Sequence, residues 1–207
     1  MGIVVSTGGS KTPVPLPVQR EKRRQARFLL GGGLVLVVLC FALLLRILAF
    51  EGVMITSGSM QPTLFKGDYT LVDHRIAIRS TWARGDVIVF EAPETWNGPG
   101  VTLVKRVIGL PGEEVGVSAG RVFVNNRFLT ENYLSEAPVP EDEQRIKLEA
   151  GQYYVMGDNR NNSDDSRNNG PIEEKNIKGR ALCLLWPISR FTRLETPEYG
   201  AVVPAAR

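Results

Sequence analysis

An uncharged apolar stretch near the N-terminus constrains this chain more than any other feature. Residues 28–45 contain no charged side chain, and the apolar character continues to Phe50. A run of this length is sufficient for one helix to cross a hydrocarbon layer of about 30 Å. The sequence therefore predicts a transmembrane anchor over residues 28–50, preceded by a basic tail over residues 1–27.

The charges around this stretch predict its orientation. A cluster of basic residues precedes it, namely Arg20, Lys22, Arg23, Arg24 and Arg27. Positive flanks remain in the cytoplasm, so we expect a single-pass protein of the cell membrane, with a cytoplasmic N-terminus and an extracytoplasmic domain over residues 51–207. A cleavable signal peptide is the alternative, but the apolar region is too long, and bulky Ile47 stands two residues before Ala49. We favour a retained anchor.

Charge and cysteine content narrow the class of the outer domain. Residues 1–50 hold seven of the 25 Lys/Arg and one of the 22 Asp/Glu, so residues 51–207 hold 18 basic and 21 acidic residues. A slightly acidic domain argues against nucleic-acid binding. The two cysteines, Cys40 in the anchor and Cys183 in an apolar run, are not expected to pair, so the domain has no disulfide framework.

The outer domain is predicted to be mostly β. Short β-branched and aromatic runs alternate with Gly, Pro, Asn and Asp, and a helical period is hardly sustained anywhere. Asn125-Asn126 is typical of a tight hairpin turn, because asparagine tolerates positive φ. We expect antiparallel sheets or a partly open barrel. The predicted strands are 52–56, 69–73, 86–91, 101–109, 113–117, 121–124, 127–130, 146–149, 152–156 and 179–185.

One lysine has the surroundings of a catalytic base. The chain has a single histidine, His74, so a serine nucleophile would need another group to take its proton. A lysine serves only if burial disfavours its ammonium form. The two-residue period of a strand places Lys105 on one face with Val101, Leu103 and Val107. The other lysines lie among glycines, charged residues or turn formers.

A polar loop follows the predicted strand that ends at Met156. It runs from Gly157 to Arg167 and is dense in short polar side chains, which favours a hydrogen-bonded loop. A hydroxyl in it would orient a neutral lysine amine, while Asp165 and Arg167 would brace the loop as an ion pair. The alternatives are a solvated turn and a calcium loop. In the calcium loop the ligands would be Asp158, Asn162 and Asp164, but Arg160 occupies a position that needs an oxygen.

Taken together, these clusters resemble the bacterial type I signal peptidases. The resemblance covers nearly the whole domain, in order and after a membrane span. Its motifs are Ser57-Gly58-Ser59-Met60-Gln61-Pro62-Thr63-Leu64, Arg84-Gly85-Asp86-Val87-Ile88-Val89-Phe90, Lys105-Arg106-Val107-Ile108-Gly109-Leu110-Pro111-Gly112, and Gly157 to Arg167.

The resemblance implies roles for particular residues. Ser59 matches the nucleophile and Lys105 the general base, which later protonates the leaving amine. Ser57 matches the hydroxyl that assists the Ser59 backbone amide in stabilising the oxyanion. Ser163 matches the hydroxyl that orients the lysine, and Asp165 with Arg167 match the supporting pair. Asn161 stands where many relatives carry aspartate, which concerns loop bracing more than chemistry.

The family removes signal peptides from secretory preproteins, cleaving after small-x-small sequences. An extended peptide would add as a strand beside residues 53–56, with Val53, Ile55 and Met60 lining small pockets or, equally, serving as ordinary strand packing. The expected partners are preprotein substrates and membrane lipid, with no cofactor, metal or nucleic acid, and the protein is expected to be a monomer. Among the tryptophans Trp82, Trp96 and Trp186, we expect contact with the lipid interface, with at least one in the core.

Several other classes remain open at this point. A self-cleaving repressor uses similar serine-lysine chemistry but needs a DNA-binding headpiece in place of the anchor. A penicillin-interacting enzyme needs Ser-x-x-Lys, whereas Pro62 stands three positions after Ser59. A tethered β domain that binds peptides or envelope partners without catalysis is the main non-enzymatic alternative, and His74 is an alternative base.

Overall fold

The computed structural model describes residues 31–44, 49–75, 82–140, 144–197 and 199, and the backbone of residues 203–204. The chain forms two compact units, Met1–Leu48 and Ala49–Arg207. In the first unit, residues 31–44 form a helix with exposed side chains. Among the described residues, no helix combines the length and the apolar character needed to cross a membrane. Residues 28–30 and 45–48 of the predicted anchor, like the basic tail, lie outside the described residues, so the span stays a prediction. Its last two predicted residues, Ala49 and Phe50, belong to the second unit, and Phe50 begins strand β1 (Phe50–Met54).

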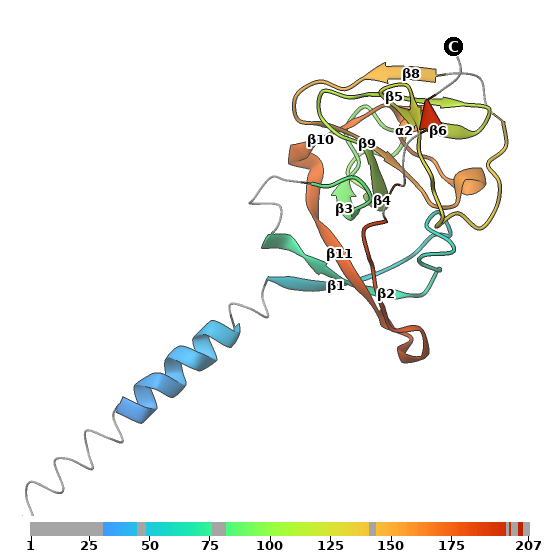
Figure 1. The fold of residues 1–207 in the computed structure, drawn as a ribbon. Helices are drawn as coiled ribbons and strands as arrows, with labels where there is room; N and C mark the ends of the chain where they lie inside the picture. Colours follow the sequence, from blue (N-terminus) through green and yellow to red (C-terminus); the bar gives the residue numbers. More distant parts are fainter. Residues whose placement is uncertain are drawn as a thin grey trace, which may run out of the picture. The chain divides into compact units, whose positions relative to one another are not determined.

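The second unit consists of two antiparallel sheets, which confirms the predicted mostly-β class (Figure 1). The larger sheet has the order β1-β2-β11-β3-β4-β9-β10, with β12 paired to β11. Its strands are β1 Phe50–Met54, β2 Tyr69–Asp73, β3 Val87–Glu91, β4 Thr102–Gly109, β9 Gln152–Met156, β10 Ile172–Glu173, β11 Ile177–Trp186 and β12 Thr192–Arg193. The strands β1 and β10 form its two ends.

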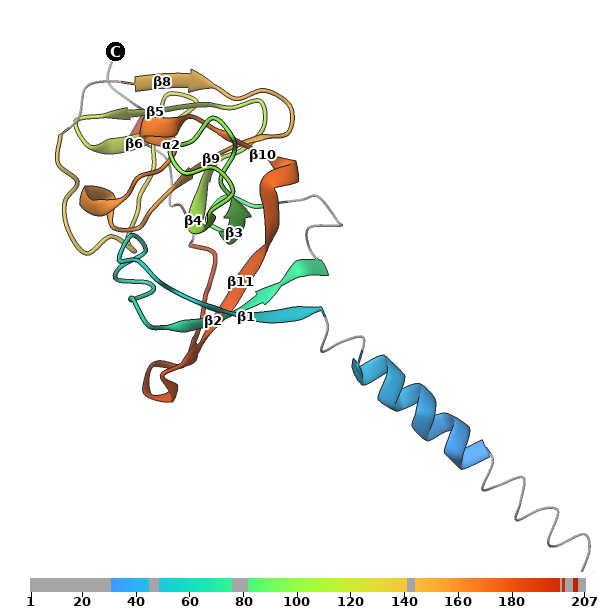
Figure 2. The same cartoon turned by 180° about the vertical axis from the view of Figure 1, so that it is seen from behind.

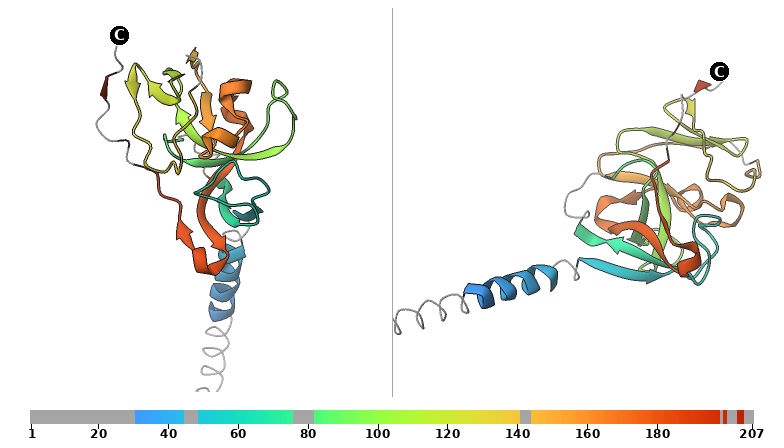
Figure 3. Two further views of the ribbon diagram at one scale, coloured as in Figure 1. Left: turned by 90° about the vertical axis from the view of Figure 1, so that its right-hand side faces the viewer. Right: turned by 60° about the horizontal axis from the view of Figure 1, so that its bottom comes forward.

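The smaller sheet has the order β13-β7-β6-β5-β8. Its strands are β5 Glu114–Ser118, β6 Arg121–Val124, β7 Arg127–Phe128, β8 Gln144–Lys147 and β13 Val203–Pro204. This sheet lies at one end of the unit, and β1, β2 and the end of β11 lie at the other (Figure 3). The short helix α2 (Ser166–Asn169) packs against β9 (Figure 2).

Three apolar clusters hold these strands together. One contains Phe90, Trp96 and Val155, a second lies at the smaller sheet around Val115 and Leu148, and a third surrounds Met60. The first four residues of β3 are all buried, as expected for a strand that is covered on both faces and therefore shows a continuous apolar run. The clusters place β3 and its neighbour β4 at the centre of the unit.

Most of the predicted strands are found close to their predicted positions. Three of them, 69–73, 121–124 and 152–156, match β2, β6 and β9 at both ends. The predicted turn is also found, since Asn125 and Asn126 both have positive φ, 49° and 62°.

Other boundaries differ because long-range pairing decides them. The first strand ends at Met54 instead of residue 56, since the backbone of Ile55 bonds to Asp68 and Gly67 outside the sheet ladder. Strand β8 begins at Gln144 instead of 146, in register with β5. The two-residue strands β10, β12 and β13 were not expected from the sequence, because two residues show no measurable period.

Candidate active site

The loop that carries Ser57 and Ser59 follows β1 and is held by its own apolar residues. Met60 and Leu64 are almost completely buried in the cluster with Val87 and Leu184. Backbone bonds from Gln61 to Gly58 and from Leu64 to Met60 tighten the turn. The serines stay accessible, with Ser57 exposed and Ser59 half-buried. Their hydroxyl oxygens lie 3.2 Å apart within hydrogen-bond range.

The first residues of the polar loop form hydrogen bonds that hold the backbone at Ser59. The amide of Asn159 donates to the Ser59 carbonyl at 2.9 Å, and the Asn159 side chain donates to the Gly58 carbonyl at 3.2 Å. Gly157 is packed between the two serine-bearing loops. A Cβ at this position would lie 2.3 Å from Ser163 Oγ and 2.5 Å from the Ser59 carbonyl oxygen, so only glycine allows this approach.

Lys105 lies in the middle of β4, opposite Ile88 of β3, with only 3% of its surface exposed. Its Nζ donates to Ser163 Oγ at 3.0 Å. Burial lowers the pKa of the Lys105 amine, although the carboxylates of Asp165 and Asp164 oppose that shift. Burial disfavours the charged amine because the strand interior cannot replace its hydration. Lys105 is the buried lysine of the described chain, since Lys66, Lys147, Lys175 and Lys178 are exposed.

The predicted neighbours of Lys105 are partly confirmed. Val107 is completely buried and Leu103 packs against the first cluster. Val101, however, precedes β4 and is exposed. Lys105 is therefore enclosed by the central residues of β4 and by the polar loop. Val101 does not contribute to this enclosure.

Ser59 and Lys105 belong to one cluster, although the described residues contain no hydrogen bond between them. The Ser59 hydroxyl bonds to Ser57, the Lys105 amine bonds to Ser163, and Gly157 contacts both halves. In enzymes without substrate, catalytic hydrogen bonds are often long and tighten on binding. The hydroxyl of Ser59 and the buried amine of Lys105 are thus linked through Gly157 and Ser163.

Asp165 and Arg167 form the predicted pair. Arg167 Nε lies 2.9 Å from Asp165 Oδ1 and Nη2 lies 3.0 Å from Oδ2, so the contact is bidentate. Further bonds run from Gly157 N to Asp165 Oδ2 at 2.9 Å and from Arg167 Nη2 to the carbonyls of Arg160 and Ser163. Burial would raise the pKa of Asp165, but the hydrogen bonds and positive charge of Arg167 outweigh it, so the pKa is lowered. The pair therefore joins the end of the polar loop to its beginning at Gly157.

A second buried pair was not identified from the sequence. Arg106 Nη2 lies 2.6 Å from Asp158 Oδ2, and Thr63 Oγ1 donates to the same oxygen at 2.5 Å. Arg106 also donates to the Gly85 carbonyl. The one sequence signal was the alternation of β4, which turns Arg106 away from the face that carries Lys105. The pair ties the serine loop, β4 and the polar loop together.

The structure bears on two of the alternatives left open above. The oxygens of Asp158 are bonded to Arg106 and Thr63, and Asp164 Oδ1 accepts from Asn168 and Asn169. These carboxylates therefore face protein donors instead of a common calcium position. The His74 ring bonds to the Lys178 carbonyl and the Glu51 carboxylate, and in the described chain it makes no hydrogen bond to Ser59.

The predicted substrate-binding residues divide into two groups. Ile55 and Met60 are buried in the third cluster, 4% and 1% exposed. Val53 is half-buried and lines a groove of about 400 Å³ along β1, together with Met54, Val89 and Thr102. Among the described strands, β1 is an end strand of its sheet, and its residues 51–54 line this groove.

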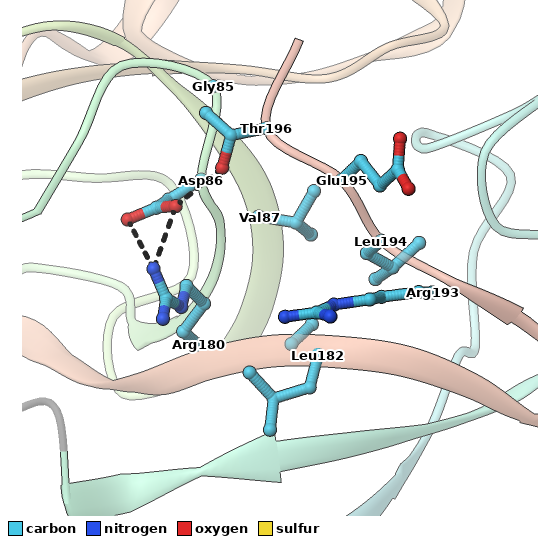
Figure 4. A pocket seen from close by; sticks show the side chains of 10 residues that line it. Gly85, Asp86, Val87, Arg180, Leu182, Arg193, Leu194, Glu195 and Thr196 are labelled. Carbon is cyan, nitrogen blue, oxygen red and sulfur yellow. Dashed lines mark hydrogen bonds and ion pairs between the residues drawn. The ribbon is translucent and has the colours of Figure 1, made fainter.

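A different cavity, of about 230 Å³, lies between β11 and the segment that follows β12 (Figure 4). The ion-paired side chains of Asp86 and Arg180 line it, and Thr196, also in the lining, donates to Asp86. The residues that line it include none of the predicted site residues. The cavity is therefore separate from the Ser59 and Lys105 cluster.

Comparison with known proteins identifies the family to which the chain is similar. Residues 28–186 match the family model described as signal peptidase, peptidase S26. A signal peptidase I of Leptolyngbya laminosa is 36% identical, covering 90% of this chain and 94% of the relative. A probable signal peptidase I-1 of Synechocystis is 38% identical, covering 88% and 91%. A crystal structure of a signal peptidase I from Enterococcus faecalis is 29% identical, with a TM-score of 0.42, covering 49% of this chain and 97% of that one. The sequence matches, which span the serine, lysine and polar-loop motifs, show that the chain belongs to the signal peptidase family, peptidase S26.

Proposed function

We propose that this chain is a membrane-bound serine endopeptidase that removes signal peptides from secretory preproteins, with Ser59 as nucleophile and Lys105 as general base. Family membership and the curated relatives support peptide hydrolysis as its activity. The observation that carries the assignment of roles is the buried Lys105 amine, which is bonded to Ser163 beside the anchored Ser59 loop. A lowered lysine pKa is what a base acting near neutral pH requires.

The proposed reaction follows from these positions. Ser59 Oγ attacks the scissile carbonyl carbon while its proton passes to the neutral Lys105 amine. The Ser59 amide and the Ser57 hydroxyl stabilise the oxyanion that forms. The tetrahedral intermediate then collapses, the peptide C–N bond breaks, and Lys105 returns the proton to the leaving amine. Water attacks the resulting ester, with Lys105 again as base, and releases the signal peptide and free Ser59.

The proposed substrate is an extended peptide beside β1. A free strand edge supplies backbone hydrogen bonds, and neighbouring pockets select side chains. The groove at Val53 supports this position. Ile55 and Met60, which lie in the core beneath the serine loop, would shape the floor of a small pocket and so favour small residues before the cut.

The proposed domain organisation is a cytoplasmic tail over residues 1–27, a single membrane span that begins at residue 28 and ends before the second unit at Ala49, and an extracytoplasmic catalytic domain that follows it. The uncharged stretch and its basic flank support the span and its orientation. We further propose that the protein acts as a monomer in the cell membrane, using no cofactor and no metal.

The test is processing of a model preprotein by the full-length protein in detergent, followed by mass spectrometry. Ser59→Ala and Lys105→Ala are each expected to abolish the cut after a small-x-small sequence, while Lys175→Ala, which removes an exposed lysine paired with Glu173, retains it. Unchanged processing by the first two variants would end the Ser59 and Lys105 assignment. Absence of cleavage by the wild-type protein, together with retained peptide binding, would instead favour the non-catalytic tethered domain.

A further inference from the structure

The segment 131–139, here called the arm, connects the smaller sheet to the polar loop of the site. It lies between β7 and β8, which are both strands of the smaller sheet. Gly120, in the turn between β5 and β6, is packed against it, because a Cβ there would lie 2.8 Å from the Pro138 carbonyl oxygen. The arm is therefore seated on the smaller sheet at one side and reaches the polar loop at the other.

The main contact between arm and loop is a buried ion pair. Arg160 Nη1 lies 2.8 Å from Glu131 Oε2 and Nη2 lies 2.5 Å from Oε1, with both side chains almost inaccessible to solvent. Arg160 Nε donates to the Gly157 carbonyl at 3.1 Å. A single guanidinium thus ties the arm to the glycine that separates Ser59 from Ser163. Burial would lower the pKa of Arg160, but Glu131 outweighs it, so the pKa is raised and the charge is retained.

Tyr133 extends this contact to the strand of the lysine. Its hydroxyl donates to Glu131 Oε1 at 2.5 Å, and Arg106 stacks over its ring at 4.3 Å from the centroid. Arg106 is the immediate neighbour of Lys105 and holds Asp158 of the polar loop. The arm therefore contacts Arg106, the neighbour of Lys105, and Arg160, which precedes Ser163 by three residues in the polar loop.

Asn161 makes a second, independent contact. Its Oδ1 accepts from the Val139 amide at 2.9 Å, and its Nδ2 donates to the Ala137 carbonyl at 3.3 Å. Only an amide satisfies both partners, because an ionised carboxylate has no donor. Asn161 thus fits both partners on the arm in a way that an aspartate at this position would not. Asn161 lies two residues before Ser163.

We propose that the arm is a positioning element for the reaction, in which Glu131 and Asn161 hold the polar loop so that Ser163 keeps Lys105 directed at Ser59. This inference rests on the proposed function. The arm residues touch neither substrate nor the reacting atoms, so they act through Ser163. Loosening the loop admits water to the lysine and moves Ser163 away from Nζ, and small misplacements of catalytic groups lower rates steeply.

The test compares matched pairs of variants of the full-length protein, at a temperature where each is fully folded. Glu131→Gln is paired with Glu114→Gln, which removes a carboxylate from the solvent-exposed ion pair with Arg145 on the smaller sheet. Asn161→Asp is paired with Asn162→Asp, the same change of charge at an adjacent exposed residue. The assay measures kcat, KM and the acid limb of kcat/KM for one model preprotein.

We expect Glu131→Gln to lower kcat about tenfold or more with KM nearly unchanged, and Asn161→Asp to lower it several-fold, as expected for misplaced catalytic groups. In both variants the acid limb moves to higher pH, because a hydrated lysine regains its affinity for a proton. Glu114→Gln is expected to leave kcat and the acid limb at their wild-type values. Asn162→Asp is expected to leave kcat unchanged, and any movement of its acid limb measures the effect of the added charge alone, which Asn161→Asp must exceed.

Equal behaviour within both pairs overturns the proposal, as does a fall in kcat with the acid limb unmoved, since the latter leaves Lys105 unaffected. If Glu131→Gln does not fold, the Asn161 and Asn162 pair decides. Retained activity in Ser59→Ala would refute the proposed function itself, which is a separate result from any difference between the arm variants.

Discussion

At the residue scale, the site depends on a few residues whose positions cost the folded state free energy. Lys105 is buried although an ammonium ion is better solvated in water, and the carboxylates of Asp165 and Asp164 only partly offset that cost. Gly157 has no side chain, because the Ser59 and Ser163 loops occupy its space. Such positions favour the reaction and disfavour the folded state, which is the usual trade-off between activity and stability.

Replacing Lys105 by methionine is expected to stabilise the protein. The folded-state pKa of Lys105 is lowered, so the lysine destabilises the fold fully below that pKa, and the penalty disappears as the pH rises towards the unfolded value of about 10.4. Lys105→Met should therefore raise the melting temperature at neutral pH, by an amount that shrinks in alkaline solution, and abolish activity. Thermal unfolding at a series of pH values measures this, with exposed Lys147→Met as control. A variant no more stable than wild type at every pH contradicts the argument.

At the scale of elements, turns and close approaches of strands give the domain its shape. The β6–β7 turn holds Asn125 and Asn126 at positive φ, and side chains then fasten it, since Asn125 Oδ1 accepts from the Glu114 amide and Asn126 Oδ1 accepts from Arg145. At the end of β4, a Cβ at Gly109 would lie 2.4 Å from Val115 of β5. That glycine allows the two sheets to pack closely.

The β6–β7 turn can be tested by two substitutions at one position. Asn126→Gly and Asn126→Val both remove the bond from Arg145, but only valine is strained at positive φ, by about 1–2 kcal/mol. The valine variant should therefore lose about that much more unfolding free energy than the glycine variant. Denaturant unfolding of the two proteins gives the difference. Equal stabilities would show that positive φ is not maintained in the turn.

At the scale of the whole molecule, an exposed apolar tip begins at the last residue of β11. Trp186, Ile188 and Phe191 are 55%, 72% and 62% exposed, respectively, around the short helix η4 (Ile188–Arg190). Trp82 and Trp96, in contrast, are both buried in the first cluster. This confirms the expectation that at least one tryptophan lies in the core. Clustered exposed apolar residues mark interaction surfaces, and amphipathic aromatic residues are enriched at lipid interfaces.

The tip is expected to matter for substrates presented at a membrane. The triple variant Trp186→Ser, Ile188→Ser, Phe191→Ser should process a preprotein embedded in vesicles several-fold more slowly, because each lost apolar contact weakens lipid binding by up to about 2–3 kcal/mol. Cleavage of a short soluble peptide should be unchanged. Val101→Ser, which removes one exposed apolar side chain elsewhere, is the control. An equal loss on both substrates would indicate damage to the site and not to lipid contact.

The sequence alone determined the features that have a local physical signature. Alternating β-branched runs predicted the central strands, Asn125-Asn126 predicted the hairpin, and the enclosed Lys105 stood out because its neighbours in the chain are apolar. Tertiary structure decided the pairings that have no such signature. Arg106 meets Asp158, and Arg160 meets Glu131, only after β4, β9 and the arm have been brought together. Periodicity reports which face a residue occupies, but the partner across a fold depends on how the sheets pack, and that is a property of the whole chain.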